Sequence, residues 1–294
     1  MISAELIKSI ADSVGAIDQA AIRSVGGGSI NRSYKIPALD GKTYFLKTNH
    51  ASALDMFHAE RDGLRELAAA DAIRVPAVIA AAVADNTAFL LMEHLELRGA
   101  SKAAGARLGS LLASQHRCGG TAYGWHRDNT IGSTPQLNGW DDEWISFFRD
   151  KRLGYQLELA VASGFDTRPG RTIRERGERL MQRLPDFFTG YQPEPSLLHG
   201  DLWGGNWGVI DNDQPVIFDP ATYYGDREAD IAMTRLFGGF GPEFLAAYND
   251  AWPLDNGFER RCGLYNLYHV LNHLNLFGVG YLRQVSDMLD SLLT

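Results

Sequence analysis

Two short apolar runs that each end at a carboxylate lie within residues 196–220, and they constrain the chain more than any other feature. The first run leads to Asp201, and a glycine-rich stretch then places Asn206 five residues further on. The second run leads to Asp219. Short apolar runs bounded by glycine and acidic residues are typical of buried strands, so we expect two strands that each deliver an acid.

This set of side chains suits phosphoryl transfer. A carboxylate and an amide oxygen are hard ligands of the kind that Mg²⁺ prefers, and an acceptor hydroxyl needs a base beside it. In protein kinases an Asn follows the catalytic Asp after five residues, and Asp201 and Asn206 keep that spacing. The alternative is a surface turn of Gly, Asp and Asn, which the apolar runs on both sides disfavour.

An upstream lysine and glutamate complete the set in the order that kinases use. Lys47 ends a strand-like run, and Glu60 lies in the helical pattern that follows, where Ser52 and Asp55 form a capping-box pattern. Kinases use a strand lysine to hold the α- and β-phosphates and a helix glutamate to pair with it. Alone, such residues are ordinarily solvated. Together with the downstream acids, they favour a nucleotide site.

Three glycines precede the lysine strand. We place Gly27, Gly28 and Ser29 near the phosphates, because glycines let backbone N–H groups approach anions closely. The run is neither GxGxxG nor a Walker motif, since no Gly-Lys-Ser or Gly-Lys-Thr follows it. On its own it predicts a flexible turn, so this placement depends on Lys47 and Asp219.

The periodicity divides the chain into two lobes with an α+β composition. Residues 1–94 show strand patterns and one helix, whereas residues 95–294 are mostly helical. We expect an antiparallel sheet in the small lobe, with nucleotide bound where the lobes meet. Glu93 and Leu95 fall where a hinge would bind adenine through its backbone.

Helical patterns in the second lobe cover residues 101–118, 140–159, 173–184, 242–252 and 258–276. Within the second of these, the spacing of the aromatic side chains predicts a helix core made of Trp140, Trp144, Phe147 and Phe148.

Composition excludes several classes of protein. The net charge is -8 and no dense basic run occurs, which disfavours nucleic acid as a partner. Residues 85–87 interrupt the most apolar stretch with polar side chains, so no membrane span is expected. The two cysteines, Cys118 and Cys262, are far apart and predict neither a disulfide framework nor a zinc site. We expect a cytoplasmic protein; its oligomeric state is open, with a monomer favoured.

Four segments resemble the fructosamine kinase (ketosamine-3-kinase) family, within the aminoglycoside-phosphotransferase-like group. They are HGDLWGGN at residues 199–206, FDPA at 218–221, residues 224–233 and residues 268–278. The similarity spans nearly the whole chain. The Trp-Gly-Gly-Asn loop separates this family from choline and aminoglycoside kinases.

The resemblance implies a protein-kinase-like bilobed fold with a small antiparallel-sheet N-terminal lobe and a larger, mostly helical C-terminal lobe. It also implies ATP- and Mg²⁺-dependent phosphorylation of the sugar O3 of a ketoamine, on a small molecule or on a protein, with a role in protein deglycation. By motif position, Asp201 would be the base and Lys47 the phosphate contact, paired with Glu60. Asn206 and Asp219 would bind the magnesium.

Other expectations follow from the same segments. Trp203 would line the sugar pocket, because flat aromatic faces suit sugar C–H surfaces, or it would pack beside the loop. Asp230 would support the catalytic loop. Gly200 replaces the Arg with which protein kinases read a phosphorylated residue, so we expect no activation-loop switch. Two other interpretations stay open: a kinase of this fold for choline, homoserine or an aminoglycoside, and a catalytically silent nucleotide-binding protein.

Overall fold

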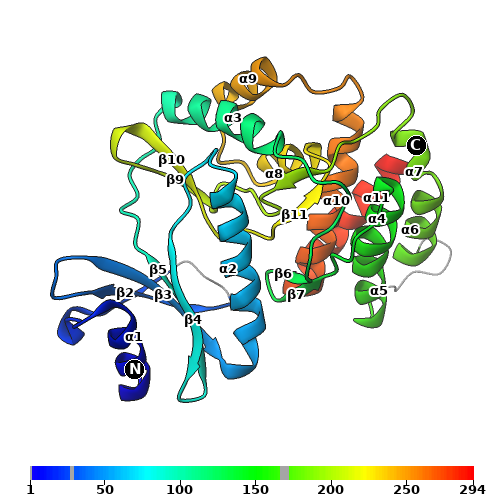
Figure 1. The fold of residues 1–294 in the computed structure, drawn as a ribbon. Coiled ribbons are helices and arrows are strands. Elements are labelled where there is room, and N and C mark those ends of the chain that lie inside the picture. Colours follow the sequence, from blue (N-terminus) through cyan, green and yellow to red (C-terminus); the bar gives the residue numbers. More distant parts are fainter. Residues whose placement is uncertain (1, 27–29, 166–171) are drawn as a thin grey trace.

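The computed structural model describes residues 2–26, 30–165 and 172–294. A five-stranded antiparallel sheet forms one end of the molecule, and helices dominate the other (Figure 1). The sheet has the strand order β1-β2-β3-β5-β4. Its strands are β1 (Arg23–Val25), β2 (Arg32–Pro37), β3 (Thr43–His50), β4 (Val78–Ala84) and β5 (Thr87–Glu93).

Helices cover both faces of this sheet. Alternate side chains of a strand point to opposite sides, so each strand contributes to both covered faces. The covering helices are α1 (Ala4–Val14) and α2 (Leu54–Ala69). On β5, Phe89 and Leu91 join one apolar cluster with α1, whereas Leu90 and Met92 join another with α2. The second cluster continues into the helical part of the chain, so α2 lies between the sheet and the helices.

The remaining elements were expected in part. The helices are α3 (Lys102–His116), α4 (Trp144–Phe148), α5 (Tyr155–Ala162), α6 (Ile173–Gln182), α7 (Leu184–Phe187), α8 (Glu228–Leu236), α9 (Pro242–Ala251), α10 (Phe258–Phe277) and α11 (Leu282–Leu293). The strand pairs are β6 (Asn129–Ile131) with β7 (Thr134–Gln136), β8 (Ser196–Leu198) with β11 (Tyr223–Gly225), and β9 (Trp207–Ile210) with β10 (Gln214–Ile217). Most predicted helices are confirmed, and the two runs that lead to Asp201 and Asp219 form β8 and β10.

Three local predictions were wrong. Residues 140–159 do not form one helix: a π-helical segment, Arg149–Gly154, separates α4 from α5, and within it the buried Arg152 donates to the side-chain Oδ1 of Asn138. Trp140 precedes α4 and is 52% exposed, so it is not part of the core. The capping box is absent as well, since the Ser52 N–H donates to the ring of His50 and no side chain caps α2.

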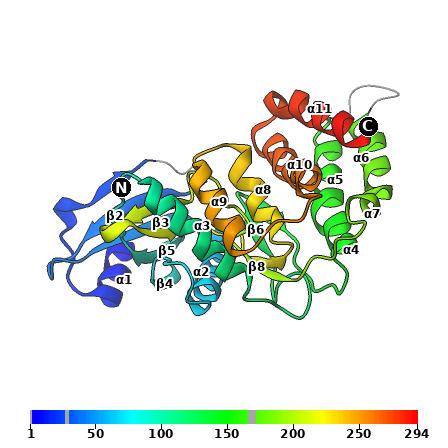
Figure 2. The same cartoon turned by 90° about the horizontal axis from the view of Figure 1, so that it is seen from above.

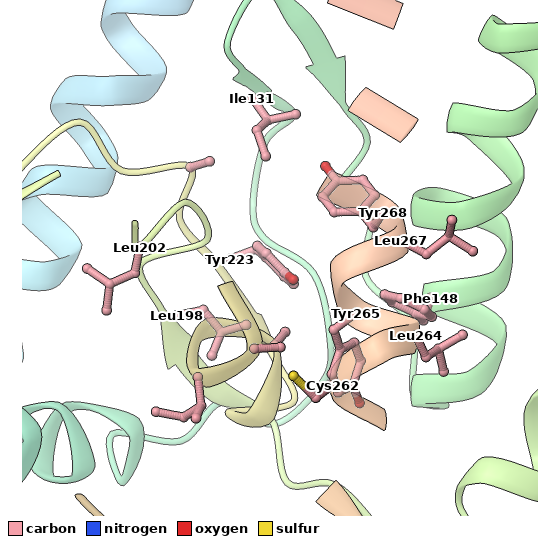
Figure 3. Packing of buried hydrophobic residues seen from close by; sticks show 14 of the residues in the cluster. Ile131, Phe148, Leu198, Leu202, Tyr223, Cys262, Leu264, Tyr265, Leu267 and Tyr268 are labelled. Atoms are coloured by element: carbon pink, nitrogen blue, oxygen red, sulfur yellow. The ribbon is translucent and has the colours of Figure 1, made fainter. Parts of the chain in front are cut away.

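The core of the helical part lies directly beneath the segment that carries the acids. Leu198 of β8 and Leu202 point into it, with Tyr223 beside them and the side chains of α10 beyond (Figure 3). Leu202 is fully buried, although Asp201 and Trp203 on either side of it are not. Burial of a leucine contributes about 1.5–3 kcal/mol, so this residue anchors the loop, while the residues on either side of it remain accessible to solvent.

Helix α10 is the centre of the helical part, with α8, α5 and α11 packed around it (Figure 2). In the described part of the chain, no helix is long and apolar enough to cross a membrane.

Candidate active site

The loop after β8 is fixed by one buried carboxylate. Asp230, in the first turn of α8, accepts hydrogen bonds from the backbone N–H groups of His199 at 2.7 Å and Gly200 at 2.8 Å. Gly200 has a φ of 83°, and a Cβ there would lie 2.0 Å from the carbonyl oxygen of Ala221. Only glycine fits such a position. The expected support of the loop by Asp230 is confirmed.

Asn206 and Asp201 are in direct contact. Nδ2 of Asn206 donates to the backbone carbonyl of Asp201 at 2.8 Å and to its Oδ2 at 3.1 Å. The backbone of Asn206 is held in turn, because its N–H donates to Trp203 and its carbonyl accepts from Phe218. The five-residue spacing therefore closes a compact loop in which the amide and the carboxylate face each other.

Asp219 follows β10 in a conformation that few residues adopt. Its φ is 57°, in the left-handed region, where Asp and Asn are better tolerated than other non-glycine residues. The backbone on either side is pinned to His199, whose ring nitrogen Nε2 bonds the carbonyl of Phe218 and whose carbonyl accepts the N–H of Ala221. Asp219 is therefore held in an unusual backbone geometry by its neighbours.

The predicted lysine and glutamate meet this acid. Lys47 of β3 lies 2.6 Å from Oε1 of Glu60 on α2 and 2.5 Å from Oδ1 of Asp219. The ammonium of Lys47 is buried and the carboxylate of Glu60 is nearly so, which means that solvent screens this pair little, whereas the side chain of Asp219 is 46% exposed. Lys47, Glu60, Asp201, Asn206 and Asp219 are thus brought together from four separate stretches of the chain.

Burial and neighbouring charges shift the protonation of these groups. Burial and the charge of Asp219 raise the pKa of Asp201 to about 7, although the hydrogen bond from Asn206 lowers it. Burial opposes the charge of Lys47, but Asp219 and Glu60 outweigh it and raise the pKa of the ammonium, which stays protonated. A carboxyl group with a pKa near neutrality is matched to proton transfer at physiological pH.

The oxygen donors fit a magnesium ion with two protein ligands. Because Nδ2 of Asn206 is committed to Asp201, the amide oxygen is left over, and within the described residues it accepts no hydrogen bond. Lys47 contacts only one oxygen of Asp219. The described chain holds no cluster of three His, Cys, Asp or Glu side chains for a metal. Magnesium commonly takes one or two protein oxygens together with substrate phosphates and water.

The expected hinge residues lie where β5 ends. The carboxylate of Glu93 pairs with Arg74 and accepts the N–H of Ala77 at 3.1 Å. The carbonyl of Arg74 accepts the N–H of Ile217 on β10, which ties this region to the strand that leads to Asp219. Leu95 follows the strand and is partly buried. Gly27, Gly28 and Ser29 lie outside the described residues.

Trp203 both packs and remains open to solvent. Its ring lies over Gly205, where a Cβ would come within 2.3 Å of it, and it meets Phe237 edge-on at 6.5 Å between ring centroids. The side chain is 40% exposed. One part of the ring is therefore fixed by contacts, and another part is accessible next to Asp201.

No pattern in the sequence pointed to Gln136 and Asn129, which secure the backbone after Asp219. Gln136 donates to the carbonyl of Ala221 at 3.0 Å, and Asn129 donates to the carbonyl of Thr222 at 2.9 Å. Both amides are buried. They come from the hairpin of β6 and β7 and hold the two consecutive carbonyls that follow Pro220.

Helix α2 is tied to the helical part of the chain on consecutive turns. Asp62 pairs with Arg127 at 2.7 Å, and Glu66 accepts a hydrogen bond from the hydroxyl of Tyr224 at 2.7 Å. Between them, Gly63 lies against Thr222, whose hydroxyl would be 2.9 Å from an added Cβ. These contacts fix the helix that carries Glu60.

Known proteins share this sequence and architecture. The chain is 45% identical over 274 residues to the "Probable ketoamine kinase" of Synechocystis, covering 92% of this chain and 90% of that protein. It is 42% identical over 275 residues to the chloroplastic protein-ribulosamine 3-kinase of Arabidopsis thaliana, covering 92% and 82%. A crystal structure from Haemophilus somnus, described provisionally as a fructosamine-3-kinase, matches with a TM-score of 0.88 at 29% identity, covering 99% and 97%.

The fold extends to more distant enzymes. An ADP-bound aminoglycoside phosphotransferase matches with a TM-score of 0.68 at 14% identity, over 99% of both chains, which shows the protein-kinase-like fold. The family model of fructosamine kinase matches residues 2–294. The chain therefore belongs to the fructosamine kinase family.

Proposed function

We propose that this protein transfers the γ-phosphoryl group of ATP to a sugar hydroxyl, O3, of a ketoamine such as a fructosamine or ribulosamine, with a role in protein deglycation. Membership of the family supports the reaction class. The observation that carries the proposal is the meeting of Asp201, with its raised pKa, with Asn206, Asp219 and the buried Lys47.

Asp201 serves as the base that orients and accepts the proton of the acceptor hydroxyl. Its carboxylate is held by Asn206, and a pKa near 7 lets it take up a proton during the reaction. Phosphoryl transfer needs little covalent chemistry from the protein, so positioning the two substrates and neutralising charge account for most of the catalysis.

Lys47 contacts the phosphates of ATP, with Glu60 holding the ammonium in place. Asn206 and Asp219 bind magnesium, whose charge neutralises the phosphate oxygens when it is bound. The backbone of Asp219, with its φ of 57°, and the contact with Lys47 hold its carboxylate in place. The charged groups are therefore arranged before any substrate arrives, which avoids a reorganisation cost during the reaction.

Further assignments complete the proposal. Residues 1–94 form the N-terminal lobe and residues 95–294 the C-terminal lobe, with adenine bound through the backbone of Glu93 and Leu95. Gly27, Gly28 and Ser29 cover the phosphates, and the exposed part of Trp203 lies against the sugar. The cytoplasmic location and the monomeric state stay predictions.

The test is an ADP-release screen with ATP and Mg²⁺ across fructosamines, ribulosamines, aminoglycosides, choline and homoserine. We expect release with ketoamines, and phosphorus NMR of the product with the signal of a secondary sugar phosphate. ADP release with another alcohol, but with no ketoamine, would show that this alcohol is the acceptor instead. ATP binding without release for any acceptor would indicate a silent nucleotide-binding protein.

A further inference from the structure

A continuous row of aromatic rings runs away from the catalytic loop. Trp203 meets Phe237, at the end of α8, with 6.5 Å between centroids, and Phe237 meets His273 of α10 at 4.8 Å. His273 then contacts Phe277 at 5.4 Å and Tyr281 at 5.2 Å. We call these five side chains the aromatic strip.

The strip is unusually accessible for its composition. Trp203 and Phe237 are each 40% exposed, and Phe277 is 53% exposed. Val279, between Phe277 and Tyr281 in the chain, is even more exposed. Single exposed apolar residues are ordinary, but a connected row of them marks a surface that contacts another molecule. Aromatic side chains are also the residues that such contact surfaces favour.

The position of the strip relative to Asp201 indicates which molecule it contacts. Lys47 and Asp219 lie on the side of Asp201 that the proposed function gives to the nucleotide. Trp203, two residues after Asp201, begins the strip. If the hydroxyl of the acceptor reaches Asp201 and its sugar lies against Trp203, the part of the acceptor beyond the sugar lies next to the strip.

A neighbouring contact borders the same surface. A Cβ on Gly132, in the turn between β6 and β7, would lie 3.2 Å from Ile30 and 2.8 Å from Leu276, the residue before Phe277. The chain that enters β2 thus approaches the end of α10 beside the strip. Apolar side chains from the segment just before β2 and from the end of α10 therefore pack together against the β6–β7 turn at this border.

We propose that the aromatic strip binds the polypeptide that carries the ketoamine, so that the acceptor is a modified lysine within an extended, apolar-flanked peptide segment. This inference rests on the proposed function. The methylene stem of the lysine and the flanking apolar side chains bury against the rings, and the cationic secondary amine lies over an aromatic face. The free ketoamine of lysine has the same stem and amine but no flanking residues, so only the peptide extends along the strip to Phe277.

The test compares two acceptors on two variants and a matched control. The acceptors are the free ketoamine of lysine and a ten-residue peptide with one ketoamine lysine flanked by leucines. The variants are Phe277→Ala and Phe237→Ala. Trp140→Ala is the control, since Trp140 is 52% exposed, as Phe277 is, but contacts Tyr224 outside the strip. KM and kcat are measured for each pair.

We expect Phe277→Ala to raise KM for the peptide roughly five-fold or more, which is the usual effect of removing an aromatic contact from a binding surface. Its kcat, and both constants for the free ketoamine, stay within about two-fold of the unsubstituted protein, because surface changes away from the reacting groups have small effects. Phe237→Ala shifts KM in the same direction, and Trp140→Ala shifts neither acceptor.

Three outcomes would overturn the inference. Equal changes in KM for both acceptors would place Phe277 in the sugar site, and no change for the peptide would leave the strip without this role. A dimer in sedimentation that Phe277→Ala converts to a monomer would show that a second copy covers the strip. Failure of the unsubstituted protein to phosphorylate either ketoamine would instead refute the proposed function, so the two failures are distinguishable.

Discussion

Asn206 donates hydrogen bonds from a single amide nitrogen to both the backbone carbonyl and the carboxylate of Asp201. This arrangement orients two groups at once. The carboxylate of Asp201 is held by the amide, and the amide oxygen of Asn206 is left without a hydrogen bond among the described residues, as its proposed role as a metal ligand requires. One short loop thereby supplies both the proposed base and a proposed metal ligand.

Replacing the base should stop chemistry without preventing nucleotide binding. We expect Asp201→Ala to lower kcat by about two orders of magnitude or more, the range for loss of a general base, while Mg·ATP affinity is nearly retained. The control is Asp211→Ala, because Asp211 is an exposed acid whose ion pair among the described residues is with Arg98. Turnover above a tenth of the original value would contradict the assignment.

Removal of the second acid should affect binding instead. We expect Asp219→Ala to abolish magnesium-dependent nucleotide binding in calorimetry, because it removes a metal ligand and one of the two partners of Lys47. Asp201→Ala serves as the comparison, since it changes a neighbouring carboxylate that the nucleotide does not need. Unchanged Mg·ATP affinity in Asp219→Ala would rule out the metal role.

The raised pKa of Asp201 predicts the pH dependence of the rate. The base acts only when it is ionised, so kcat/KM should fall about tenfold per pH unit below the pKa of about 7 and level off above it. Initial rates with a ketoamine across this range measure the profile. A rate that stays constant down to about pH 5.5 would show that ionisation of Asp201 is not required.

The same pKa shift also predicts that the free energy of unfolding depends on pH, in the direction opposite to the rate. A carboxyl group whose pKa is higher in the folded than in the unfolded state binds its proton more tightly when folded. The stability that this proton gives the fold is therefore lost as the pH rises from 3.8, the ordinary pKa of the group, to about 7, and it changes little above that. We expect Asp201→Asn to raise the free energy of unfolding by roughly 1–2 kcal/mol near pH 8.

The difference between Asp201→Asn and the unsubstituted protein should shrink as the pH falls below 7, because the carboxyl group of the folded unsubstituted protein is then protonated and as uncharged as the amide of the variant. Urea unfolding at a series of pH values measures it. A difference that grows toward acid would contradict the direction of the pKa shift.

The buried amide of Gln136 should affect magnesium binding, although Gln136 is not itself a proposed metal ligand. Gln136→Leu leaves the carbonyl of Ala221 and the hydroxyl of Tyr268 without their partner. Unpaired buried polar groups cost about 1–3 kcal/mol each, so with two such groups the free energy of unfolding should fall by roughly 2–6 kcal/mol.

Because the backbone after Asp219 is then released, we also expect weaker magnesium-dependent nucleotide affinity for Gln136→Leu in calorimetry. Gln284→Leu on α11, away from this network, is the control. Lower stability with unchanged affinity would mean that Gln136 supports the fold but does not position Asp219.

The site was predictable where the chemistry dictates residue type. Metal and phosphate binding require carboxylates, an amide and an ammonium, and the spacing of Asp201, Asn206 and Asp219 carries that requirement in the sequence. Gln136 and Arg127 leave no such trace, because they bond a backbone carbonyl or a distant helix that only the fold brings near. Their partners lie 65 or more residues away in the chain.

Fold prediction failed for similar physical reasons. Helix α8 was not predicted, since the acids Glu228 and Asp230 are buried and break the apolar pattern on which periodicity depends. The π-helical segment was missed because an extra residue in a turn has no sequence signature, and the partners of Arg152 are remote. Helix α10 was predicted although Asn272 is buried in it, because its long run of apolar residues dominates.

Helix α2 is held in its position by several contacts at once. The ion pair of Asp62, the hydrogen bond of Glu66 and the close packing of Gly63 fasten it to the half of the molecule that carries Asp219. Swinging Glu60 outward would break all three together. The fold therefore keeps Glu60 beside Lys47 without a separate event that sets the helix in place.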